Sequence, residues 1–567
     1  MYMLITGLTL SLYYAIYVDM YITEVLTKTK KGLVSHRCVL LRESFRKDGK
    51  INSRTIANLT HCNPAEVAAM RLALQHKDDL TVLKSLKEIE VEQGLSVGAA
   101  WLVYQVAREI GIETALGKDR AGKLALWQVM ARVINQGSRL SAVRLAQVHA
   151  GCDILGLREG FNEDDLYDNL GWLAENQSQI EERLFSKRCS GKKPELFLYD
   201  VTSSYFEGEC NELSDWGYNR DKKSGKKQVV LGLLCNESGD PLCIQVYRGN
   251  ILDFETFEGQ IKKVAAKFGC QRVTLVGDRG MIKSGQITAL GEAKFHYITA
   301  ITKPQIEKLL RAGVFQMELF DQPLYEVEQA GIRYVLRRNP ERVKEIVAMR
   351  QGKKRSIEKL CEQANGYLTE HPRARAVTQL KKVAMKLEQL KVCGWLKVIA
   401  EGKRLELKED AAALAEEAKL DGCYVIKSDL PKEVTSQVIH DRYKDLAQVE
   451  QAFRTCKTGL LEMRPWYVTK EESTRGHALE VMLAYQIIHY LQQAWAGFNL
   501  TVEEGIAQLS LIVSTKMTIK GQESCQRITR PGSAADQLLT AVKVQLPQVL
   551  PDLGARVVSR KQLQMSR

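Results

Sequence analysis

The stretch Val273–Met281, VTLVGDRGM, places a carboxylate at the end of an apolar run. The aliphatic and β-branched side chains before it are typical of a buried strand, and Asp278 follows where that strand should end. An aspartate there can simply form a turn, because its side chain bonds the local backbone, and Gly280 favours that interpretation. A catalytic role for Asp278 therefore requires partner carboxylates elsewhere in the chain.

The sequence around this stretch predicts alternating strands and helices. LFLYDVTSS, QVVLGLLC and PLCIQVYRG predict three strands, FEGQIKKVAAKFG predicts a helix, and VTLVG, a second helix and FHYITAIT follow. This order predicts an α/β fold, a ribonuclease-H-like core with a mixed sheet whose first three strands are antiparallel. The first and fourth strands are then neighbours, so Asp200 and Asp278 would meet.

The rest of the sequence can be divided into segments by the spacing of its apolar and charged residues. Apolar residues three and four apart predict helices from Pro64 to about Leu184, in which Arg132, Arg139 and Arg144 make DNA binding possible. LDGCYVIKSDL resembles a strand that returns to the core, and a long helix is expected from about Lys432. The expected divisions are an upstream extension (1–19), a small strand-rich basic arm (20–60), a helical DNA-binding or dimerisation region (61–190), the first part of the core (191–303), an inserted subdomain (304–420), the remainder of the core with the glutamate helix (421–499), and a C-terminal region (500–567).

Composition indicates a globular, multidomain protein with a polyanionic partner. The 567 residues are 45% hydrophobic and carry a formal net charge of +13. Thirteen cysteines lie scattered without a C-x-x-C pair, which favours a reducing cytoplasm over a zinc ribbon or disulfide framework. Basic side chains gather in loop-like clusters that suggest nucleic acid: Lys187-Arg188 with Lys192-Lys193, Arg220 with Lys222-Lys223 and Lys226-Lys227, and Lys353-Lys354-Arg355. In the C-terminal region Lys516, Lys520 and Arg527 could contact DNA or serve solubility.

The first eighteen residues carry no charge and are barely long enough to cross a bilayer. They lack a basic n-region and a small-residue cleavage site, and Met20 offers an alternative start. We expect an upstream extension rather than a membrane anchor, and no membrane partner.

A third carboxylate comes from the predicted helix YKDLAQVEQAFRTCKTGL. Residues at intervals of three and four share one face of it: Tyr443, Leu446, Glu450, Arg454 and Lys457. Taken alone, Glu450 and Arg454 could form an ordinary surface ion pair, worth about 0.3–0.5 kcal/mol. Asp200, in an otherwise apolar strand, must meet a cation, a hydrogen-bond donor or a metal.

The spacing Tyr443-x2-Leu446-x3-Glu450-x6-Lys457 resembles the Y-(2)-R-(3)-E-(6)-K signature of DDE transposases from bacterial insertion sequences, of the IS-four superfamily. LYDVTSSYFEG around Asp200, VGDRGMIKSGQI around Asp278 and VEQAFRTCKTGLLEMRPWYV also look like this family, and the resemblance runs from about Met20 to about Leu491. Leu446 stands where the family has arginine. Arg442 or Arg454 could make the DNA contact that the family assigns to that arginine.

This resemblance implies that Asp200, Asp278 and Glu450 hold two divalent ions, Mg²⁺ or Mn²⁺. Hard oxygen ligands suit these ions, which can activate water or a DNA 3′-hydroxyl and stabilise the leaving oxygen. Tyr443 and Lys457 would contact phosphates near the cleaved end, with Arg464 as a further candidate. Trp466 is expected in the core, and His477 as a packing or capping residue.

The resemblance predicts a transposase that binds double-stranded DNA at the terminal inverted repeats of its element, cuts there, and joins the 3′ ends to target DNA. A homodimer is expected in the synaptic complex. Two alternatives remain open: a non-catalytic DNA-binding relic of a transposase, or another ribonuclease-H-like nuclease such as a resolvase.

Overall fold

The computed structural model describes ten stretches of the chain: 19–28, 34–47, 50–77, 89–189, 193–208, 210–266, 268–270, 273–464, 466–519 and 525–559. The expected extension at 1–18 lies outside them. The chain forms two compact units, Met1–Gln93 with Thr515–Gln526, and Gly94–Ser514 with Arg527–Arg567. Three strands contribute residues to both: β4 (Ile89–Ser96), β15 (Val513–Ile519) and β16 (Cys525–Ile528).

The first unit contains a three-stranded antiparallel sheet in the order β1-β2-β3 and one helix. Its elements are β1 (Asp19–Lys28), β2 (Val34–Lys47), β3 (Lys50–Asn58) and α2 (Pro64–Gln75). Asn63 begins the helix, because its side chain accepts from the Ala65 N–H at 3.0 Å while Glu66 accepts from the Asn63 N–H at 2.9 Å. Val39, Leu59 and Val67 form a small core.

Helices dominate both ends of the second unit. They are α3 (Gly98–Glu109), α4 (Ile112–Leu116), α5 (Arg120–Ile134), α6 (Arg139–Val148), α7 (Gly151–Leu155), α8 (Glu163–Arg188), α17 (Glu471–Ala494), α18 (Val502–Ser510) and α19 (Ser533–Ala541). Helix α17 packs on α5 and α8. Its run of apolar side chains has no long polar stripe, so it is buried through most of its length. No helix among the described residues combines the length and apolar composition needed to span a membrane.

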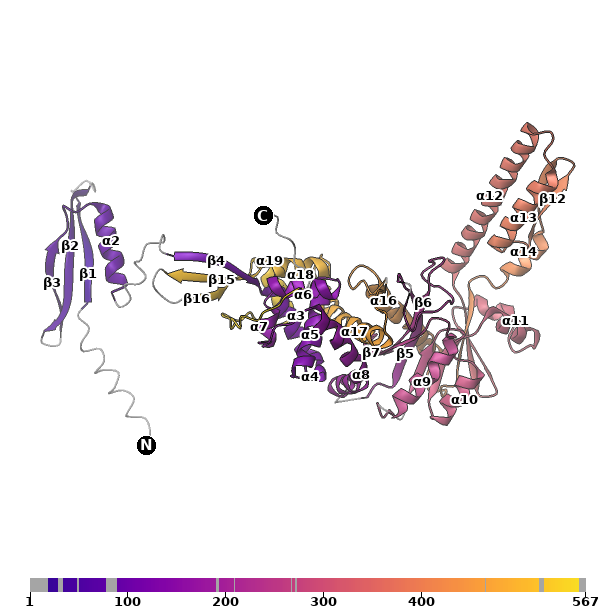
Figure 1. Ribbon diagram of the computed structural model, residues 1–567, viewed down its shortest axis with the longest axis horizontal. Coiled ribbons are helices and arrows are strands. Elements are labelled where there is room, and N and C mark those ends of the chain that lie inside the picture. Colours follow the sequence, from indigo (N-terminus) through magenta and orange to yellow (C-terminus); the bar gives the residue numbers. More distant parts are fainter. Residues whose placement is uncertain are drawn as a thin grey trace. The chain divides into compact units, whose positions relative to one another are not determined.

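An eight-stranded mixed sheet follows, in the order β10-β11-β14-β9-β8-β5-β6-β7. Figure 1 labels β5, β6 and β7 among its strands. Its elements, with the connecting helices, are β5 (Leu196–Tyr205), β6 (Gln228–Asn236), β7 (Pro241–Arg248), α9 (Asp253–Ala266), β8 (Thr274–Gly277), α10 (Ser284–Glu292), β9 (His296–Ala300), β10 (Tyr325–Gln329), β11 (Ile332–Arg338) and β14 (Cys423–Ser428). Strands β5, β6 and β7 are antiparallel, and β5 runs parallel to β8, as does β9. This is the predicted strand order, with the first and fourth strands adjacent.

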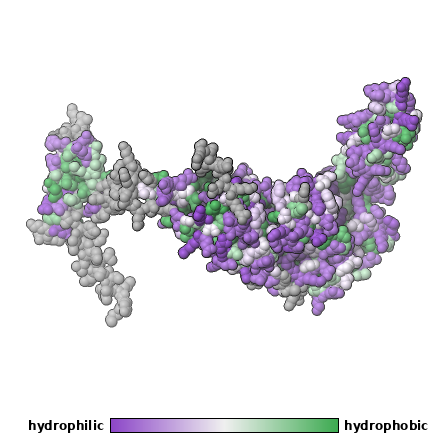
Figure 2. Space-filling view, viewed as in Figure 1, coloured by the Kyte–Doolittle hydropathy of each residue, from purple (hydrophilic) through white to green (hydrophobic). Residues whose placement is uncertain are grey.

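The segment 304–420 was expected to form one inserted subdomain, but only part of it lies outside the main sheet. Strands β10 and β11 extend the main sheet through β14, and the four consecutive residues Arg333–Leu336 of β11 are buried, so both sides of this strand are covered. A separate apolar core, with Ile357, Leu387 and Trp395, is built by other elements of this segment. The elements of the segment outside the sheet are α11 (Lys303–Arg311), the 3₁₀ helix η3 (Met317–Asp321), α12 (Pro340–Glu370), α13 (Ala376–Leu390), β12 (Leu396–Glu401), β13 (Arg404–Glu409) and α14 (Ala411–Ala418). Figure 2 shows hydrophilic side chains over much of the visible face of α12–α14.

The single long helix expected from Lys432 is wrong. The chain forms α15 (Ser436–Lys444) and α16 (Leu446–Lys457), with a break at Asp445. Aspartate is a weak helix former because its side chain competes for local hydrogen bonds. The Asp445 carboxylate accepts from Arg442 at 3.2 Å, and the Asp445 carbonyl accepts from the Gln448 N–H at 2.9 Å in a tight turn.

Candidate active site

Three carboxylates from separate elements line one cavity of about 440 Å³. Asp200 lies within β5, Asp278 directly follows β8, and Glu450 lies on α16. Tyr199 and Gly277 are partners in the parallel β5–β8 ladder, so Asp200 and Asp278 are the next residues along two adjacent strands. Helix α16 packs on β5 and brings Glu450 to the same cavity.

The three acids bring negative charge together on the wall of a cavity that basic side chains also line. Burial raises the pKa of Asp200 to about 7, the charges of Asp278 and Glu450 add to this rise, and the Val201 N–H and Arg220 oppose it. Desolvation and like charges both disfavour the ionised form of a carboxyl group. A cation placed between these groups would relieve both effects.

The donor set fits a hard divalent cation. In the stretches that the structure describes, no three His, Cys, Asp or Glu side chains are already gathered closely enough to hold a metal ion. The three acids nevertheless offer only oxygen ligands and repel one another, which is the chemistry that Mg²⁺ and Mn²⁺ require of a site.

Tyr443 contacts an acid directly. Its hydroxyl donates to Asp278 Oδ1 at 3.1 Å. Burial, followed by the Asp278 charge, raises the pKa of Tyr443, so the phenol remains a donor. In this arrangement the Tyr443 hydroxyl orients Asp278 on the wall of the cavity.

Two of the expected DNA-contacting cations bind Asp221. The Lys457 ammonium lies 3.0 Å from Asp221 Oδ1, and the Arg464 guanidinium contacts the same oxygen. The side chain of Lys457 is 9% exposed and that of Arg464 is 27% exposed. Burial lowers the pKa of Lys457, and Asp221 opposes the shift.

The remaining residues of the signature helix differ in exposure. Arg454 is exposed, whereas Arg442 is half-buried and pairs with Asp445 at 3.2 Å. Leu446, which stands where the family has arginine, is 8% exposed and packs into the main core. Arg442 and Arg454 are the two candidates to replace the signature arginine, and Arg454 is the more exposed of the two.

Sequence reasoning missed four cations that line the same cavity. Lys303 and Arg342 have acidic partners, Asp421 at 3.8 Å and Glu345 at 2.7 Å. Arg279 and Lys444 are exposed and have no ion-pair partner within the described stretches. Their positions gave a signal, because Arg279 directly follows Asp278 and Lys444 directly follows Tyr443.

Trp466 and His477 are packing residues, as expected. Trp466 is 1% exposed, and its indole N–H donates to Ser204 Oγ at 2.8 Å. His477 lies edge-on to Trp466 with ring centroids 5.2 Å apart, and its Nδ1 is 3.2 Å from Glu480 Oε2. Burial lowers the pKa of His477 to about 4.

Two arginines that suggested DNA binding in the helical region are not available for it. Arg132 and Arg139 are buried against Glu480 on α17, and Arg132 Nε lies 3.3 Å from Glu480 Oε1. We call Arg132, Arg139 and Glu480 the buried ion cluster. Arg144 is exposed.

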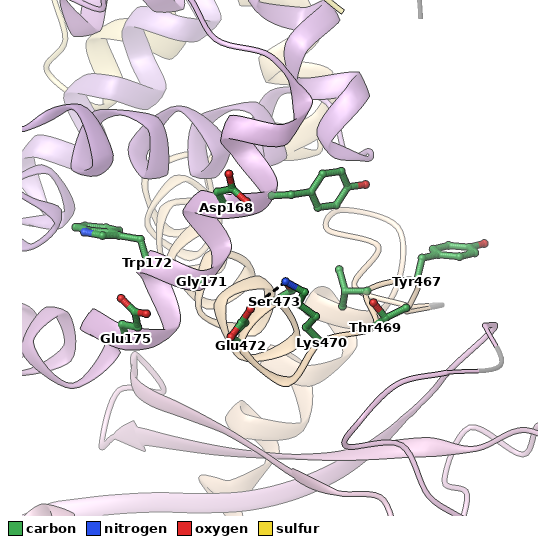
Figure 3. A pocket seen from close by; sticks show the side chains of 11 residues that line it. Asp168, Gly171, Trp172, Glu175, Tyr467, Thr469, Lys470, Glu472 and Ser473 are labelled. Carbon is green, nitrogen blue, oxygen red and sulfur yellow. Dashed lines mark ion pairs between the residues drawn. The ribbon is translucent and has the colours of Figure 1, made fainter. Parts of the chain in front are cut away.

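A larger cavity, of about 590 Å³, lies between α8 and the start of α17 (Figure 3). None of the three acids of the candidate active site lines it. Its lining includes Asp168, Glu175 and Glu472, and Lys470 pairs with Glu472 at 3.5 Å. This excess of negative charge disfavours a phosphate backbone.

The mixed sheet, with β5, β6 and β7 antiparallel in turn and β8 parallel to β5, has the strand order of a ribonuclease-H-like core. The chain belongs to the transposase DDE domain family, which it matches over residues 191–487, more than half of its length. Residues 23–82 match the IS1634 family transposase N-terminal domain. The protein is therefore a DNA transposase of the DDE type.

Among solved structures, the chain is similar to a piggyBac transposase synaptic complex with hairpin DNA, determined by cryo-EM. The identity is 9%, the likeness covers 73% of this chain and 76% of that chain, and the TM-score is 0.35. No match was found among curated proteins.

Proposed function

We propose that this transposase binds the terminal inverted repeats of its own element, cleaves DNA at the element ends, and transfers the 3′ ends to target DNA. The observation that carries the proposal is the convergence of Asp200, Asp278 and Glu450 on one cavity. Three acids from distant parts of the chain would repel one another there without a cationic ligand.

Asp200, Asp278 and Glu450 would hold two divalent ions, Mg²⁺ or Mn²⁺. Such ions supply an activated oxygen nucleophile and stabilise the leaving oxygen of an in-line displacement. The side chains contribute position: Asp200 is fixed by its strand, Asp278 by the Tyr443 hydroxyl, and Glu450 by the packing of α16 on β5.

Cations around the cavity would hold the DNA. Arg279 and Lys444 line it and are exposed, so they are placed to contact phosphates beside the scissile bond. Arg454, Arg464 and Arg442 would extend this contact along the backbone, with Arg454 in the role of the signature arginine that Leu446 replaces.

Other expectations belong to the same proposal. We place the chain in the IS-four superfamily, in the cytoplasm, and as a homodimer in the synaptic complex. We also propose that residues 340–418, which include the separate core of α12–α14, are the inserted subdomain. The free cysteines among the described residues agree with a reducing compartment.

The test is a cleavage and strand-transfer assay on DNA that carries the flanking inverted repeats. The wild-type protein should cut at the repeat ends and join the 3′ ends to target DNA in Mg²⁺. Asp278→Asn and Glu450→Gln should each lower cleavage at least about 10³-fold, because each removes a ligand of the ions that carry the charge of the transition state. End binding measured in EDTA should remain.

Three results would contradict parts of the proposal. Full cleavage by either variant would refute the assignment of the acids. Cleavage without joining by the wild-type protein would indicate a resolvase-like nuclease. End binding without any cleavage would indicate a non-catalytic relic.

A further inference from the structure

Another cavity, of about 850 Å³, lies beside the candidate active site. Ser284, the first residue of α10, and Thr302, which directly precedes α11, line it. Ala300, at the end of β9, lines both this cavity and the cavity of the three acids. The hydroxyl of Thr299, also in the lining, donates to the carbonyl of Asp278 at 3.3 Å. The two cavities therefore meet where β8 and β9 end.

The charges in the lining of this cavity are all positive. Among the described residues three lysines and no acidic side chain line it: Lys283, Lys308 and Lys427. None of these lysines has an ion-pair partner in the stretches that the structure describes. The cavity between α8 and α17, in contrast, is lined by three acids and one lysine. We call the cavity with the three lysines the lysine cavity, and its charge attracts anions.

Lys427 belongs to the sheet itself. It lies on β14, and its cross-strand partners are Thr299 on β9 and Tyr334 on β11, which also line the lysine cavity. Ile426 and Val335, the adjacent residues on β14 and β11, pack in the main core on the side that α15 covers. Side chains alternate along a strand, so Lys427 and its two partners face the opposite side of the sheet.

The position of Lys427 is costly without an anion. Burial lowers the pKa of Lys427, and Asp429 opposes the shift. Asp429 accepts from the Tyr297 N–H at 2.9 Å, and its other oxygen lies 3.4 Å from His296 Nδ1. The Lys427 ammonium lies 5.7 Å from the centre of the Tyr297 ring, which is a weak cation–π contact. A bound anion would recover the free energy that a half-buried, unpaired ammonium loses.

The other two lysines can meet a ligand from the solvent side. Lys283 and Lys308 are exposed, and the Lys283 ammonium lies 3.9 Å from the centre of the Phe254 ring. Helices α10 and α11 both begin at this cavity, and the N-terminus of a helix adds partial positive charge. A partly buried lysine with two exposed lysines beside it suits a chain of phosphates better than a single ion.

We propose that the lysine cavity binds phosphates of the target DNA during strand transfer. This inference rests on the proposed function, in which Arg279, Lys444 and Arg454 hold the element end. In an in-line displacement the attacking 3′-hydroxyl and the leaving oxygen lie on opposite sides of the phosphorus. The target strand must therefore reach the ions from a direction that the element end leaves free. The lysine cavity provides one, because it adjoins Asp278 but lies on the opposite face of the sheet from α15 and α16.

The test is the joining of precut element ends, which carry no flanking DNA, to a target duplex without inverted repeats. Lys427→Met and the double variant Lys283→Met/Lys308→Met should each raise the target concentration that half-saturates joining about tenfold. The salt dependence of this concentration should weaken by about one logarithmic slope unit for each lysine that contacts a phosphate. Cleavage of uncut ends, and end binding in EDTA, should stay within about twofold of the wild type, since no phosphate contact of the end is removed.

The same variants distinguish target DNA from the DNA that flanks the element. If the lysines hold flanking DNA, the variants should weaken binding and cleavage of uncut ends and leave the joining of precut ends unchanged. If the lysines are merely solvated, the half-saturating target concentration should not change in any variant. Either result would overturn the inference.

Two controls complete the design. Lys427→Arg keeps the charge and should restore joining, whereas Lys262→Met removes an exposed lysine that pairs with Glu258 on α9 and should change nothing. Thermal unfolding of each variant shows whether it has folded.

A binding measurement separates this inference from the proposed function. If the wild-type protein cuts and joins no ends, the proposed function fails. The affinity for a repeat-free duplex in EDTA, measured by fluorescence anisotropy, still tests the lysine cavity, and Lys427→Met should lower it about tenfold. Equal affinities of the wild-type protein and the lysine variants would reject the lysine cavity alone.

Discussion

Two carboxylates of the second unit, Glu480 and Asp200, are largely buried, but their pKa values shift in opposite directions. Burial alone would raise the pKa of Glu480, but Arg139 and Arg132 outweigh it and hold that pKa well below its usual range. At Asp200 burial raises the pKa to about 7, and the nearest charges that matter are the acids Asp278 and Glu450. Both side chains are carboxylates, so the difference in pKa comes from the charges around them and not from the type of residue.

The difference shows how to separate a structural charge from a functional one. In the buried ion cluster both guanidinium groups contact the one carboxylate of Glu480, so each charged group has a protein partner of opposite sign. At the candidate active site Asp200, Asp278 and Glu450 form no ion pair within the described stretches, although basic side chains also line the cavity, so the charge that the three acids share costs stability unless a cation binds. Four changes, from the largest expected effect to the smallest, test this contrast.

Glu480→Gln should have the largest effect on stability. It keeps the shape of the side chain but leaves Arg132 and Arg139 buried without a counter-charge, which should lower the free energy of unfolding by about 3–5 kcal/mol. Urea denaturation measures the change. Glu258→Gln, in an exposed pair with Lys262, is the matched control and should leave the midpoint unchanged. A loss below about 1 kcal/mol for Glu480→Gln would show that the cluster is not a structural element.

Added Mg²⁺ should stabilise the wild-type protein. Binding to the folded state alone contributes about 2.7 kcal/mol at a free concentration 100 times the Kd. Thermal unfolding with Mg²⁺, and with KCl at matched ionic strength, measures it. Asp200→Asn should abolish the response specific to Mg²⁺. An equal response in that variant would place the ion elsewhere.

Asp200→Asn should stabilise the ion-free protein. A carboxyl whose pKa is higher in the folded state stabilises the fold fully only below its unfolded pKa, near 4, and this contribution is lost as pH rises through the folded value, about 7. The ionised group is therefore a net cost above pH 7. We expect a gain of at least about 1 kcal/mol at pH 8 in EDTA, discounted for partial solvation, that shrinks toward zero near pH 4. A constant gain at every pH would contradict this cause.

Tyr443→Phe should have the smallest effect. It removes the hydroxyl that donates to Asp278, and one hydrogen bond to a charged group contributes about 1.5–3 kcal/mol when buried and less at an exposed acceptor such as Asp278. We expect a loss below about 1.5 kcal/mol and a change of less than about threefold in the Mg²⁺ requirement. Unfolding and metal titrations measure the two quantities. A loss of end binding in EDTA would instead indicate a phosphate contact.

Much of the fold could be predicted from the sequence because the signals were local. The alternation of apolar residues predicted the strands around Asp200 and Asp278, and their order predicted that the two strands are adjacent. The break at Asp445 and the pairing of β10 and β11 with the main sheet were missed. The pairing of β10 and β11 with the sheet depends on contacts with distant residues, which a periodic pattern does not contain. The break at Asp445 depends on short-range hydrogen bonds with Arg442 and Gln448, which the helical periodicity does not reveal.

The candidate site was predicted only in part, because some of its residues carry a local sequence signal and others are defined by contacts with distant residues. The resemblance supplied Glu450, and the cavity then brought it together with Asp200 and Asp278. Asp221 was not singled out, since an aspartate between Arg220 and Lys222 in a loop resembles a solvated charge. Its role became visible only when Lys457 and Arg464, more than 230 positions away, were found against it.

The sequence by itself determined the strand order and the residues that can carry metal chemistry, because both follow from side-chain type and short-range spacing. Only the tertiary structure decided which charges are compensated. The field at a carboxylate depends on burial and on neighbours within a few ångströms, and these neighbours come from anywhere in the chain. Lys457 and Arg139 resemble DNA contacts in the sequence, and the fold places both against protein carboxylates.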